Sequence, residues 1–510
     1  TYLAAYRYSF TSVLEAMGVK LNESAAYQDL SLKLHFPAGK KGVFELTGMG
    51  GRNLIGLTES DKPQEKWLFP EHGEDLHTKS LFGAGSISHL YFFNEKTRLR
   101  SRISYNISGI ETKIDTFELP APVPYRWAGE NSMQQIVTGA VSLTRKIDAR
   151  NSFDAGISYD LMMVSFADSQ YYHGYYRYYT DANYKMGLLK AYSGFQHHFG
   201  PKVSSTIGLH FQYFTLNGSF SAEPRLGLRW NATAASAFSA GFGMHSQLVP
   251  AMLYFTQALA DKGGYARTNT GLDFMRSLHA VAGYDYLLGE HMRFKAEGYY
   301  QYLYNAPVRE GIPQYSVLNE GIEYYFFRYD SLVSLGTGMN YGIDLTLERF
   351  LHRNYYFLFT ASLFRSYYSG YDNVKRSTVF DNRYVLNAVG GYELPVGELR
   401  NHFLVFGLRA TWTGGRPYVP FDVDQTVAEG QVVYDWENAY RERFQDYIRG
   451  SLRLGFRRNV PNANIMLLID LQYRSNYTYV DLYRIDVKTG EIVSGHRMGF
   501  YPMATWRIQF

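Results

Sequence analysis

The 510-residue sequence contains no cysteine, which excludes disulfide bonds, zinc–thiolate sites and cysteine nucleophiles. Charged residues are also sparse, at 19%, and the net charge of +4 is too small to indicate a nucleic-acid partner. No stretch approaches the roughly 18 consecutive apolar residues that a transmembrane helix requires. The first residues alternate at once between apolar and polar types, with no signal peptide, so we interpret the sequence as a mature, processed or truncated chain.

Catalytic and cofactor-binding motifs are missing as well. The sequence has no GxSxG nucleophile elbow, no HExxH, no Walker A loop and no GxGxxG. We therefore predict no catalytic residue, no cofactor and no metal site, and a protein that is not an enzyme. One alternative is calcium, which prefers oxygen ligands, although solvated loop carboxylates are far more common. The carboxylates of that alternative, all in one long segment, are Asp422, Asp424, Asp435 and Glu437.

Aromatic residues and glycine are abundant: there are 46 Tyr, 34 Phe, 6 Trp and 47 Gly against 16 Pro. This composition favours β structure, and apolar residues recur at every second position along most of the chain. In residues 464–474, one face carries only apolar and aromatic side chains, whereas the other includes charged ones. The first face consists of Ile465, Leu467, Ile469, Leu471 and Tyr473, and the second of Met466, Leu468, Asp470, Gln472 and Arg474.

Such alternating strands fit two kinds of protein. In a soluble sheet the apolar face is the core and the charged face meets solvent, whereas in a membrane barrel the apolar face meets lipid and the charged face lines the lumen. The strands read as about 12 to 15 residues, longer than the usual five or six, and when tilted near 45° they would rise roughly 30 Å, enough to cross a bilayer. The length favours the membrane barrel.

We count about 20 strands in the sequence. The links between them alternate between short and long, which is typical of outer-membrane barrels. The short links lie near 38–42, 94–97, 147–151, 200–202, 233–237, 289–291, 352–354, 397–401 and 461–464. The long links lie near 54–78, 112–130, 167–183, 247–270, 307–335, 415–446 and 477–497. This alternation places the last residue at the end of the strands that carries the short turns.

Tyrosine clusters occur where strands meet the long links, at 171–179, 299–304, 324–329 and 365–371. Because amphipathic rings favour the membrane interface, we interpret them as an aromatic girdle; the alternatives are aromatics of a soluble β-sheet and a stacking platform for sugar. Arginines on the charged faces are predicted to line the inner wall and to pair with a plug or with wall carboxylates; guiding an anionic solute is the alternative. These arginines are Arg98, Arg100, Arg102, Arg449, Arg453 and Arg457, and the carboxylates are Asp344, Glu348 and Asp470.

Several stretches resemble the barrel of TonB-dependent outer-membrane receptors, in the branch that often carries a carboxypeptidase-regulatory-like N-terminal domain. They are YRYSF (6–10), YQDLSLKLHFP (27–37), EPRLGLRWN (223–231), GGRPYVPFD (414–422), RFQDYIRGSLRLGFR (443–457) and the C-terminal TWRIQF. Gln445 stands where the family often has proline, and Gly450–Ser451 replaces a Leu-Asp pair. Each stretch is weak alone, but their order and spacing span the chain from end to end.

The resemblance implies an all-β fold: a large antiparallel transmembrane β-barrel with about 20 strands in this chain and 22 in the full protein. Residues 1–510 would be the C-terminal part of a receptor, beginning in the third strand, with the plug, the TonB box and the first strands absent. The implied function is TonB-dependent import of a scarce nutrient across the outer membrane of a Gram-negative bacterium. The alternatives are a docking barrel for a surface lipoprotein or secretion complex, and a soluble carbohydrate-binding β protein.

The implied partners are the TonB-ExbB-ExbD system acting through the plug, outer-membrane lipid, the barrel assembly machinery and a surface lipoprotein, with no nucleic acid. The last strand ends on an apolar stripe that resembles the C-terminal signal read by the assembly machinery, carried by Trp506, Ile508 and Phe510. We expect substrate to bind in the long loops and upper lumen. The candidate ligand-binding residues are Tyr175, Tyr176, Tyr178, Tyr325, Arg328 and Arg416.

Overall fold

The computed structural model is almost entirely β structure, as the period-two pattern predicts. It contains a 22-stranded antiparallel sheet, in which β16 and β19 are short and the other 20 strands agree with the predicted number. Among the described residues, no helix is long and apolar enough to cross a membrane. The residues that the structure describes are 1–8, 23–57, 74–116, 125–172, 175–260, 263–321, 328–397, 401–430, 432–474, 483–487, 489–494 and 500–510.

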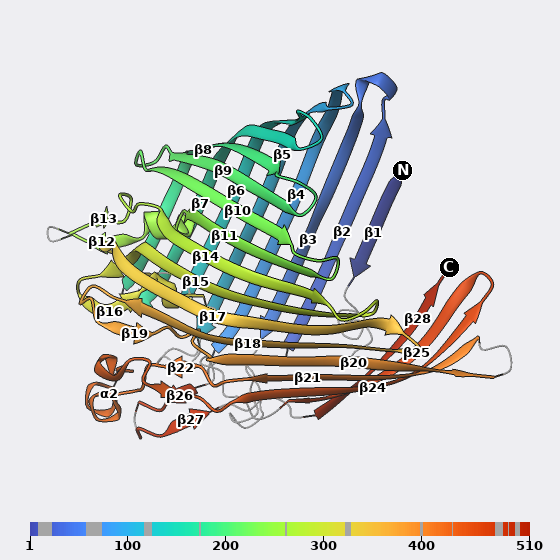
Figure 1. The fold of residues 1–510 in the computed structure, drawn as a ribbon. Helices are drawn as coiled ribbons and strands as arrows, with labels where there is room; N and C mark the ends of the chain where they lie inside the picture. The colour runs from blue at the N-terminus through green and yellow to red at the C-terminus, as the bar shows by residue number, and fades with distance from the viewer. Residues whose placement is uncertain are drawn as a thin grey trace. The chain divides into compact units, whose positions relative to one another are not determined.

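The chain divides into two compact units. The first unit comprises Thr1–Leu226, Met244–Arg276 and Tyr325–Ser334. In it, β1 to β9 pair in chain order, each strand antiparallel to the next, as Figure 1 shows from blue to green. Its strands are β1 (Tyr2–Tyr8), β2 (Glu23–Pro37), β3 (Val43–Leu57), β4 (Glu74–Asn94), β5 (Thr97–Thr116), β6 (Tyr125–Lys146), β7 (Asn151–Tyr172), β8 (Tyr175–His198), β9 (Val203–Phe214), β12 (Gln257–Leu259) and β13 (Tyr265–Arg267), and its 3-10 helices are η1 (Gly39–Lys41) and η3 (Ala251–Phe255).

The second unit comprises Gly227–Gly243, Ser277–Tyr324 and Leu335–Phe510. Its long strands pair in the order β17, β18, β20, β21, β24, β25 and β28. Four strands contribute residues to both units: β10 (Phe220–Asn231), β11 (Ser236–Gln247), β14 (Met275–Leu287) and β17 (Leu332–His352). The remaining elements are β15 (Met292–Arg309), β16 (Ile312–Ser316), η4 (Val317–Asn319), β18 (Tyr355–Ser369), β19 (Lys375–Ser377), β20 (Tyr384–Val396), β21 (His402–Thr413), β22 (Pro417–Tyr418), α2 (Val423–Glu429), η5 (Trp436–Asn438), β23 (Glu442–Arg443), β24 (Tyr447–Val460), β25 (Ala463–Arg474), β26 (Tyr483–Ile485), β27 (Ile492–Ser494) and β28 (Phe500–Gln509).

Turns occupy eight of the nine predicted short links, from η1 between β2 and β3 to the two-residue turn between β24 and β25, and the ninth, at 397–401, includes residues outside the described ranges. In the first of them, Gly42 has a φ of 91°, and a Cβ there would lie 2.0 Å from the carbonyl oxygen of Leu90. Only glycine fits this turn, because it tolerates positive φ and lets the neighbouring backbone approach.

Two predictions about the strands were wrong. The segment 167–183, predicted as a long link, is mostly strand, since β7 continues to Tyr172 and β8 begins at Tyr175. Several strands also exceed the predicted 12 to 15 residues, and β8 reaches 24. Tyrosine favours extended backbone, so the aromatic clusters prolong the strands where they were predicted to end them.

Burial is inverted relative to a soluble sheet. On one face of β25, Leu467 and Ile469 are 51% and 45% exposed. On the opposite face, Leu468 and Asp470 are only 6% and 5% exposed. The apolar face is therefore the open one, and the face with charged residues is covered. This pattern fits a strand whose apolar side meets lipid, and it contradicts the soluble alternative, in which the apolar face would be the core.

Ion pairs cover the charged face of the second unit. Arg453 of β24 pairs with Asp470 of β25, at Nε–Oδ1 2.8 Å, as predicted. Arg457 pairs with Glu393 of β20 rather than with one of the predicted carboxylates, through bonds of 2.8 and 2.7 Å. Opposite charges thus compensate one another within the wall, between adjacent strands for Arg453 and across the intervening β21 for Arg457.

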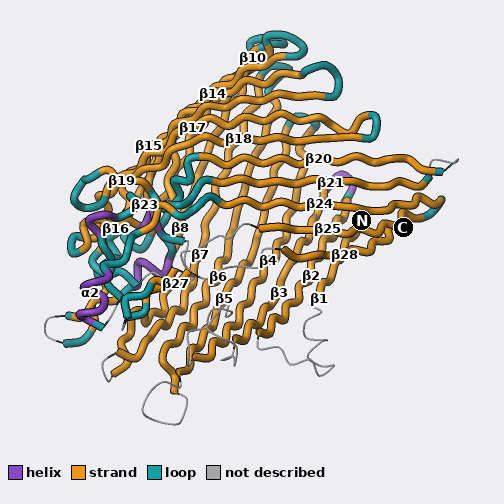
Figure 2. Tube along the Cα trace, turned by 90° about the horizontal axis from the view of Figure 1, so that it is seen from below, coloured by secondary structure: helices purple, strands orange, loops and turns teal. Residues whose placement is uncertain are grey.

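The short elements of the second unit gather at one end of its long strands. Figures 1 and 2 both place α2, the β22–β23 pair and β27 at the same end of β20, β21 and β24. At the other end, Gln509 pairs with Asn464, which follows the turn after β24. The last residue therefore lies at the short-turn end, as predicted.

Candidate functional site

Three of the predicted ligand-binding tyrosines lie at the first residues of β8. Tyr175, Tyr176 and Tyr178 are 47%, 40% and 47% exposed. The hydroxyl of Tyr176 donates to the carbonyl oxygen of Arg126 at 2.6 Å, and its ring meets that of Tyr171 edge-on at 5.4 Å. The other two rings are also open, and because they are three positions apart they lie on opposite faces of β8, next to a register shift in its pairing with β7.

Arg328, the fourth predicted residue, is already engaged by the wall. Its Nε and Nη2 each donate to a carboxylate oxygen of Asp168 at 2.8 Å, and its Nη1 donates to Gln170 at 2.5 Å. Asp168 is 1% exposed, so this bidentate pair is shielded from water. The pair ties the segment after residue 327 to the end of β7.

Two arginines share one aromatic ring beside that pair. The guanidinium carbon of Arg328 lies 4.4 Å from the ring centre of Tyr179, and that of Arg177 lies 4.7 Å from the same centre. A tyrosine face attracts cations, which lets two positive groups approach the same ring. Arg177 also lies 4.0 Å from Asp330. The cluster of Arg177, Tyr179 and Arg328 is thus basic, aromatic and partly exposed.

A buried carboxyl group lies on the neighbouring strand. Glu130 of β6 faces Asp168 in the register of β6 and β7, is 4% exposed, and accepts a 2.5 Å hydrogen bond from Ser132. Sequence reasoning missed Glu130, Asp168 and Gln170, because nothing in their own segments marks them. Arg177 and Tyr179 do lie in the predicted tyrosine cluster, which was the available signal.

A loop with its own core lies against the same unit. The packed loop, residues 248–274, connects β11 to β14 and contains η3, β12 and β13. Phe255 contacts Tyr184 of β8, with ring centres 5.1 Å apart, and Tyr254 contacts Phe214 of β9 at 5.3 Å. Phe214, Tyr254 and Phe255 are all fully buried. Tyr265 of β13 reaches the backbone of β8, because its hydroxyl accepts from the N–H of Tyr178 at 3.3 Å.

The last two predicted ligand residues are Tyr325 and Arg416. Tyr325 lies outside the described residues. Arg416 lies in the second unit, directly before β22, and its carbonyl oxygen accepts from the N–H of Phe444 at 2.9 Å. A Cβ on the adjacent Gly415 would lie 1.7 Å from the carbonyl oxygen of Phe444. The GGRP stretch therefore serves a close backbone approach.

Asp446 links the close backbone contact between Gly415 and Phe444 to the strands of the sheet. Its carboxylate accepts hydrogen bonds from the hydroxyl of Tyr384, from Nε1 of Trp412 at 2.9 Å and from the N–H of Gly415 at 3.1 Å. These bonds favour the ionised carboxylate, so the pKa of Asp446 is lowered, chiefly by Tyr384. The stretches 414–422 and 443–457, both of which resemble the receptor family, thus contact each other, and this contact holds the backbone in place.

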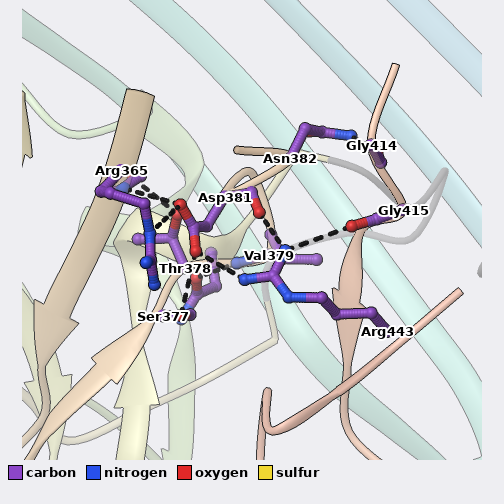
Figure 3. Close-up of polar contacts among 11 residues, drawn as sticks. Arg365, Ser377, Thr378, Val379, Asp381, Asn382, Gly414, Gly415 and Arg443 are labelled. Atoms are coloured by element: carbon purple, nitrogen blue, oxygen red, sulfur yellow. Dashed lines mark hydrogen bonds and ion pairs between the residues drawn. The ribbon is translucent and has the colours of Figure 1, made fainter. Parts of the chain in front are cut away.

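A second polar cluster, centred on Asp381, lies beside this contact, and Figure 3 shows its hydrogen bonds and ion pairs. Asp381 is fully buried and accepts from Nη2 of Arg443 at 2.6 Å, from the N–H of Ser366 at 3.0 Å and from the hydroxyl of Ser377 at 3.1 Å. The Nε of Arg365 lies 3.4 Å from the same carboxylate.

The described residues contain no group of three or more side chains able to hold a metal ion. Two of the loop carboxylates considered for calcium instead cap helices. Asp422 accepts from the N–H of Gln425 at 3.0 Å at the start of α2, and Asp435 accepts from the N–H of Asn438 at 3.2 Å at the start of η5. Capping satisfies N–H groups that would otherwise lack partners at a helix start.

The C-terminal stripe stands on the open face of β28. Trp506 pairs with Leu467 and Ile508 with Ile465, and the exposed fractions of Trp506, Ile508 and Phe510 are 72%, 37% and 101%. The predicted alternation of the last strand is therefore present.

Comparison with known proteins gives a consistent result for the fold. Neither family models nor curated protein sequences match the chain. Solved structures do match: the ferric-catecholate import receptor Fiu of E. coli K12 in its closed form has a TM-score of 0.63 at 10% identity, over 95% of this chain and 75% of that one. The ferric yersiniabactin uptake receptor FyuA of Yersinia pestis has a TM-score of 0.61 at 12% identity, over 96% and 71%. FpvA of P. aeruginosa, bound to a pyoverdine–iron complex, has a TM-score of 0.66 at 11% identity, over 100% and 67%.

The chain has the fold of TonB-dependent receptor barrels. This confirms the predicted fold and the resemblance at the level of architecture. The structures share about one residue in ten with this chain, so they carry the arrangement of strands and not the identity of any ligand.

Proposed function

We propose that this chain is the barrel of a TonB-dependent importer in the outer membrane of a Gram-negative bacterium. The observation that carries the proposal is the inverted burial of the sheet, with Leu467 and Ile469 open and Asp470 covered, in a chain that has the fold of uptake receptors. An apolar outer face suits lipid, and a charged inner face suits an aqueous or plugged lumen.

Energy would come from outside the barrel. In this proposal the TonB-ExbB-ExbD system acts on a plug inside the barrel, so the chain itself binds and releases a nutrient without covalent chemistry. The barrel assembly machinery would insert the chain by reading Trp506, Ile508 and Phe510. A surface lipoprotein above the long loops is a further partner of the same proposal.

Ligand would bind at the long-loop end of the first unit. The open rings of Tyr175 and Tyr178 offer stacking surface on β8, and Arg177 and Tyr179 of the same strand form the basic cluster with Arg328, which follows residue 327. Because Asp168 already holds Arg328, a ligand anion at this arginine would have to share or displace that carboxylate. Tyr176, Tyr325 and Arg416 complete the proposed ligand-binding set.

The test is growth of the native host with one nutrient limiting at a time, using iron chelates, cobalamin, oligosaccharides and peptides. Deleting the gene should abolish growth on one nutrient, and deleting TonB should abolish growth on the same one. A Tyr175→Ala/Tyr178→Ala variant should lower uptake of that nutrient at low concentration. Tyr213→Ala is the matched control, because this tyrosine of β9 is 44% exposed.

The results separate importer from docking barrel. If the gene deletion impairs the cell surface equally with and without TonB, and no nutrient depends on the protein, the importer proposal is wrong and a docking function replaces it. Recovery of the protein in the soluble fraction would overturn both.

A further inference from the structure

A hollow of about 750 Å³ crosses four strands of the second unit. It spans β14, β15, β17 and β18, and small residues leave the space open. At Gly298 a Cβ would meet no atom within 4 Å. The larger lining side chains are apolar or aromatic: Val281, Tyr300, Tyr341, Ile343 and Leu363.

The large side chains of the hollow stand on the open, apolar face of the sheet. Ile343 pairs with Leu363, and the two are 52% and 51% exposed. Their neighbours on the opposite face, Asp344 and Ser362, are polar and also paired. Since the apolar face is the one that meets lipid in the proposed function, the hollow is open to the membrane.

Two arginines line the same hollow. Arg365 follows Leu363 by two residues and pairs with Tyr341, so it stands on the apolar face. Arg383 also lines the hollow and is exposed. An arginine on the lipid-facing side of a strand is expensive near the bilayer centre and inexpensive at the interface. The aromatic pair of Tyr384 and Trp412, with ring centres 5.6 Å apart, places this level at the interface.

Positive charge is in excess around Asp381. This one buried carboxylate bonds Arg443 and lies 3.4 Å from Arg365, as Figure 3 shows. Arg383 adds a third guanidinium, and the nearby carboxylate of Asp446 is engaged by Tyr384, Trp412 and Gly415. Burial lowers the pKa of Arg443, Asp381 raises it, and the like charges of Arg383 and Arg365 act in the same direction as burial.

We propose that the hollow binds one phosphorylated, acylated membrane lipid, with an acyl chain over Gly298 and a phosphate on Arg365 and Arg383. Arginine binds phosphate through paired N–H donors, and a phosphate would relieve the repulsion among the three guanidiniums. The site lies outside the proposed ligand region and adds a lipid to the partners of the barrel. It rests on the membrane placement in the proposed function, not on import.

The test is native mass spectrometry of the full-length protein in detergent, with diphosphoryl lipid A as the probe. The same lipid A after removal of its phosphates measures binding by acyl chains alone, and inorganic phosphate as competitor measures binding by anion alone. The variants are Arg365→Gln/Arg383→Gln, which removes the phosphate contacts, and Gly298→Leu, which fills the hollow where a Cβ meets nothing. Arg443 and Asp381 stay intact in both.

Matched controls test whether the effect belongs to the hollow. Gly139→Leu places the same side chain on the apolar face of β6, where a Cβ also meets nothing and the neighbouring Ile103 is 68% exposed. Arg150→Gln removes an arginine from a short turn. Retention of the heat-sensitive folded band on a gel shows that each variant still forms a barrel.

We expect wild-type protein and both controls to retain one lipid A, and each hollow variant to bind it at least about tenfold more weakly. Removal of the phosphates from lipid A should weaken its binding to the wild type by the same factor as the Arg365→Gln/Arg383→Gln substitution weakens binding of the intact lipid. Equal retention by wild type and both variants overturns the proposal, as does full displacement of the lipid by inorganic phosphate. The nutrient assay reports separately on import, because neither variant touches the proposed ligand region.

Discussion

Arg453 and Asp470 face each other across β24 and β25 and are joined by two hydrogen bonds of 2.8 and 3.0 Å. The side chain of Asp470 is 7% exposed, and that of Arg453 is 42% exposed. The pair neutralises charge on the covered face of a sheet whose other face is apolar. On that face β24 carries Arg449, Arg453 and Arg457, and Asp470 compensates the central one, so neither partner of this pair is left as an isolated charge.

Asp470→Asn should therefore destabilise the barrel. The substitution keeps the size of the side chain but leaves Arg453 facing a neutral amide. We expect a loss of about 2 kcal/mol, below the usual range for a fully buried pair because Arg453 is partly solvated. Urea unfolding in detergent, followed by the gel shift of the folded band, measures it. Glu45→Gln is the control: its partner Lys33 is 55% exposed, so the loss should stay below about 1 kcal/mol.

Asp446→Asn should loosen the long loop between β21 and β24. It weakens three hydrogen bonds to one carboxylate, which corresponds to about 1 kcal/mol and roughly fivefold more frequent local opening. Faster cleavage within 414–446 by chymotrypsin at pH 7 would show it. An unchanged cleavage rate would mean that the loop is held elsewhere. Asp424→Asn, at an exposed carboxylate of α2, should leave the rate unchanged.

The same carboxylate predicts a pH dependence. The pKa of Asp446 is lower in the folded state than in the unfolded chain, where it is about 3.9, so its stabilisation is present above that value. It is lost as the pH falls through the lowered folded pKa. Pepsin cleavage of the loop should therefore distinguish wild type from Asp446→Asn at pH 4.5, and the difference should shrink towards pH 2.5. A difference that grows with acidity would contradict the assignment.

The sheet was predictable because its pattern is local. Each side chain of β25 alternates between the two faces, so Ile465 to Arg474 could be assigned to faces without knowing any neighbour. Short turns were also visible as breaks in that pattern. The ends of β7 and β8 were not, because the same tyrosines suit a strand and a loop base.

The candidate site depended on contacts between distant segments. Arg328 meets Asp168 across 160 positions of the sequence, and no property of either segment specifies that distance. The packed loop shows the same limit: residues 251–255 are too short for a period to be recognised, and Leu253, Tyr254 and Phe255 are buried only in the folded protein, where the two aromatic rings contact β8 and β9. The register of two strands within a hairpin is therefore determined by the local sequence, whereas the packing of a loop against distant strands is not.

Asn269→Ala should release the packed loop. Its side chain is fully buried; its Nδ2 donates to the carbonyl oxygens of Leu253 and Tyr329, each at 2.9 Å, and its Oδ1 accepts from the N–H of Leu332 at 2.9 Å. Losing three buried hydrogen bonds should cost about 2 to 3 kcal/mol of local stability. Hydrogen exchange at 251–259 should become faster in Asn269→Ala and stay unchanged in Asn131→Ala, at an exposed asparagine of β6. Protection equal to wild type in both would mean that the aromatic contacts alone hold the loop.

Removal of Phe510 should separate assembly from stability. The side chain is 101% exposed and follows the last paired residue of β28, so it contributes no packing that unfolding would lose. If the barrel assembly machinery reads the terminal aromatic, the truncated protein should reach the outer membrane in several-fold lower amount. The molecules that do fold should unfold in urea at the wild-type midpoint. Phe199→Ala, at a 62% exposed phenylalanine of a short turn, controls for the loss of an exposed aromatic side chain. A lowered midpoint with normal amounts in the membrane would instead make Phe510 a structural residue, and the proposed signal would be wrong.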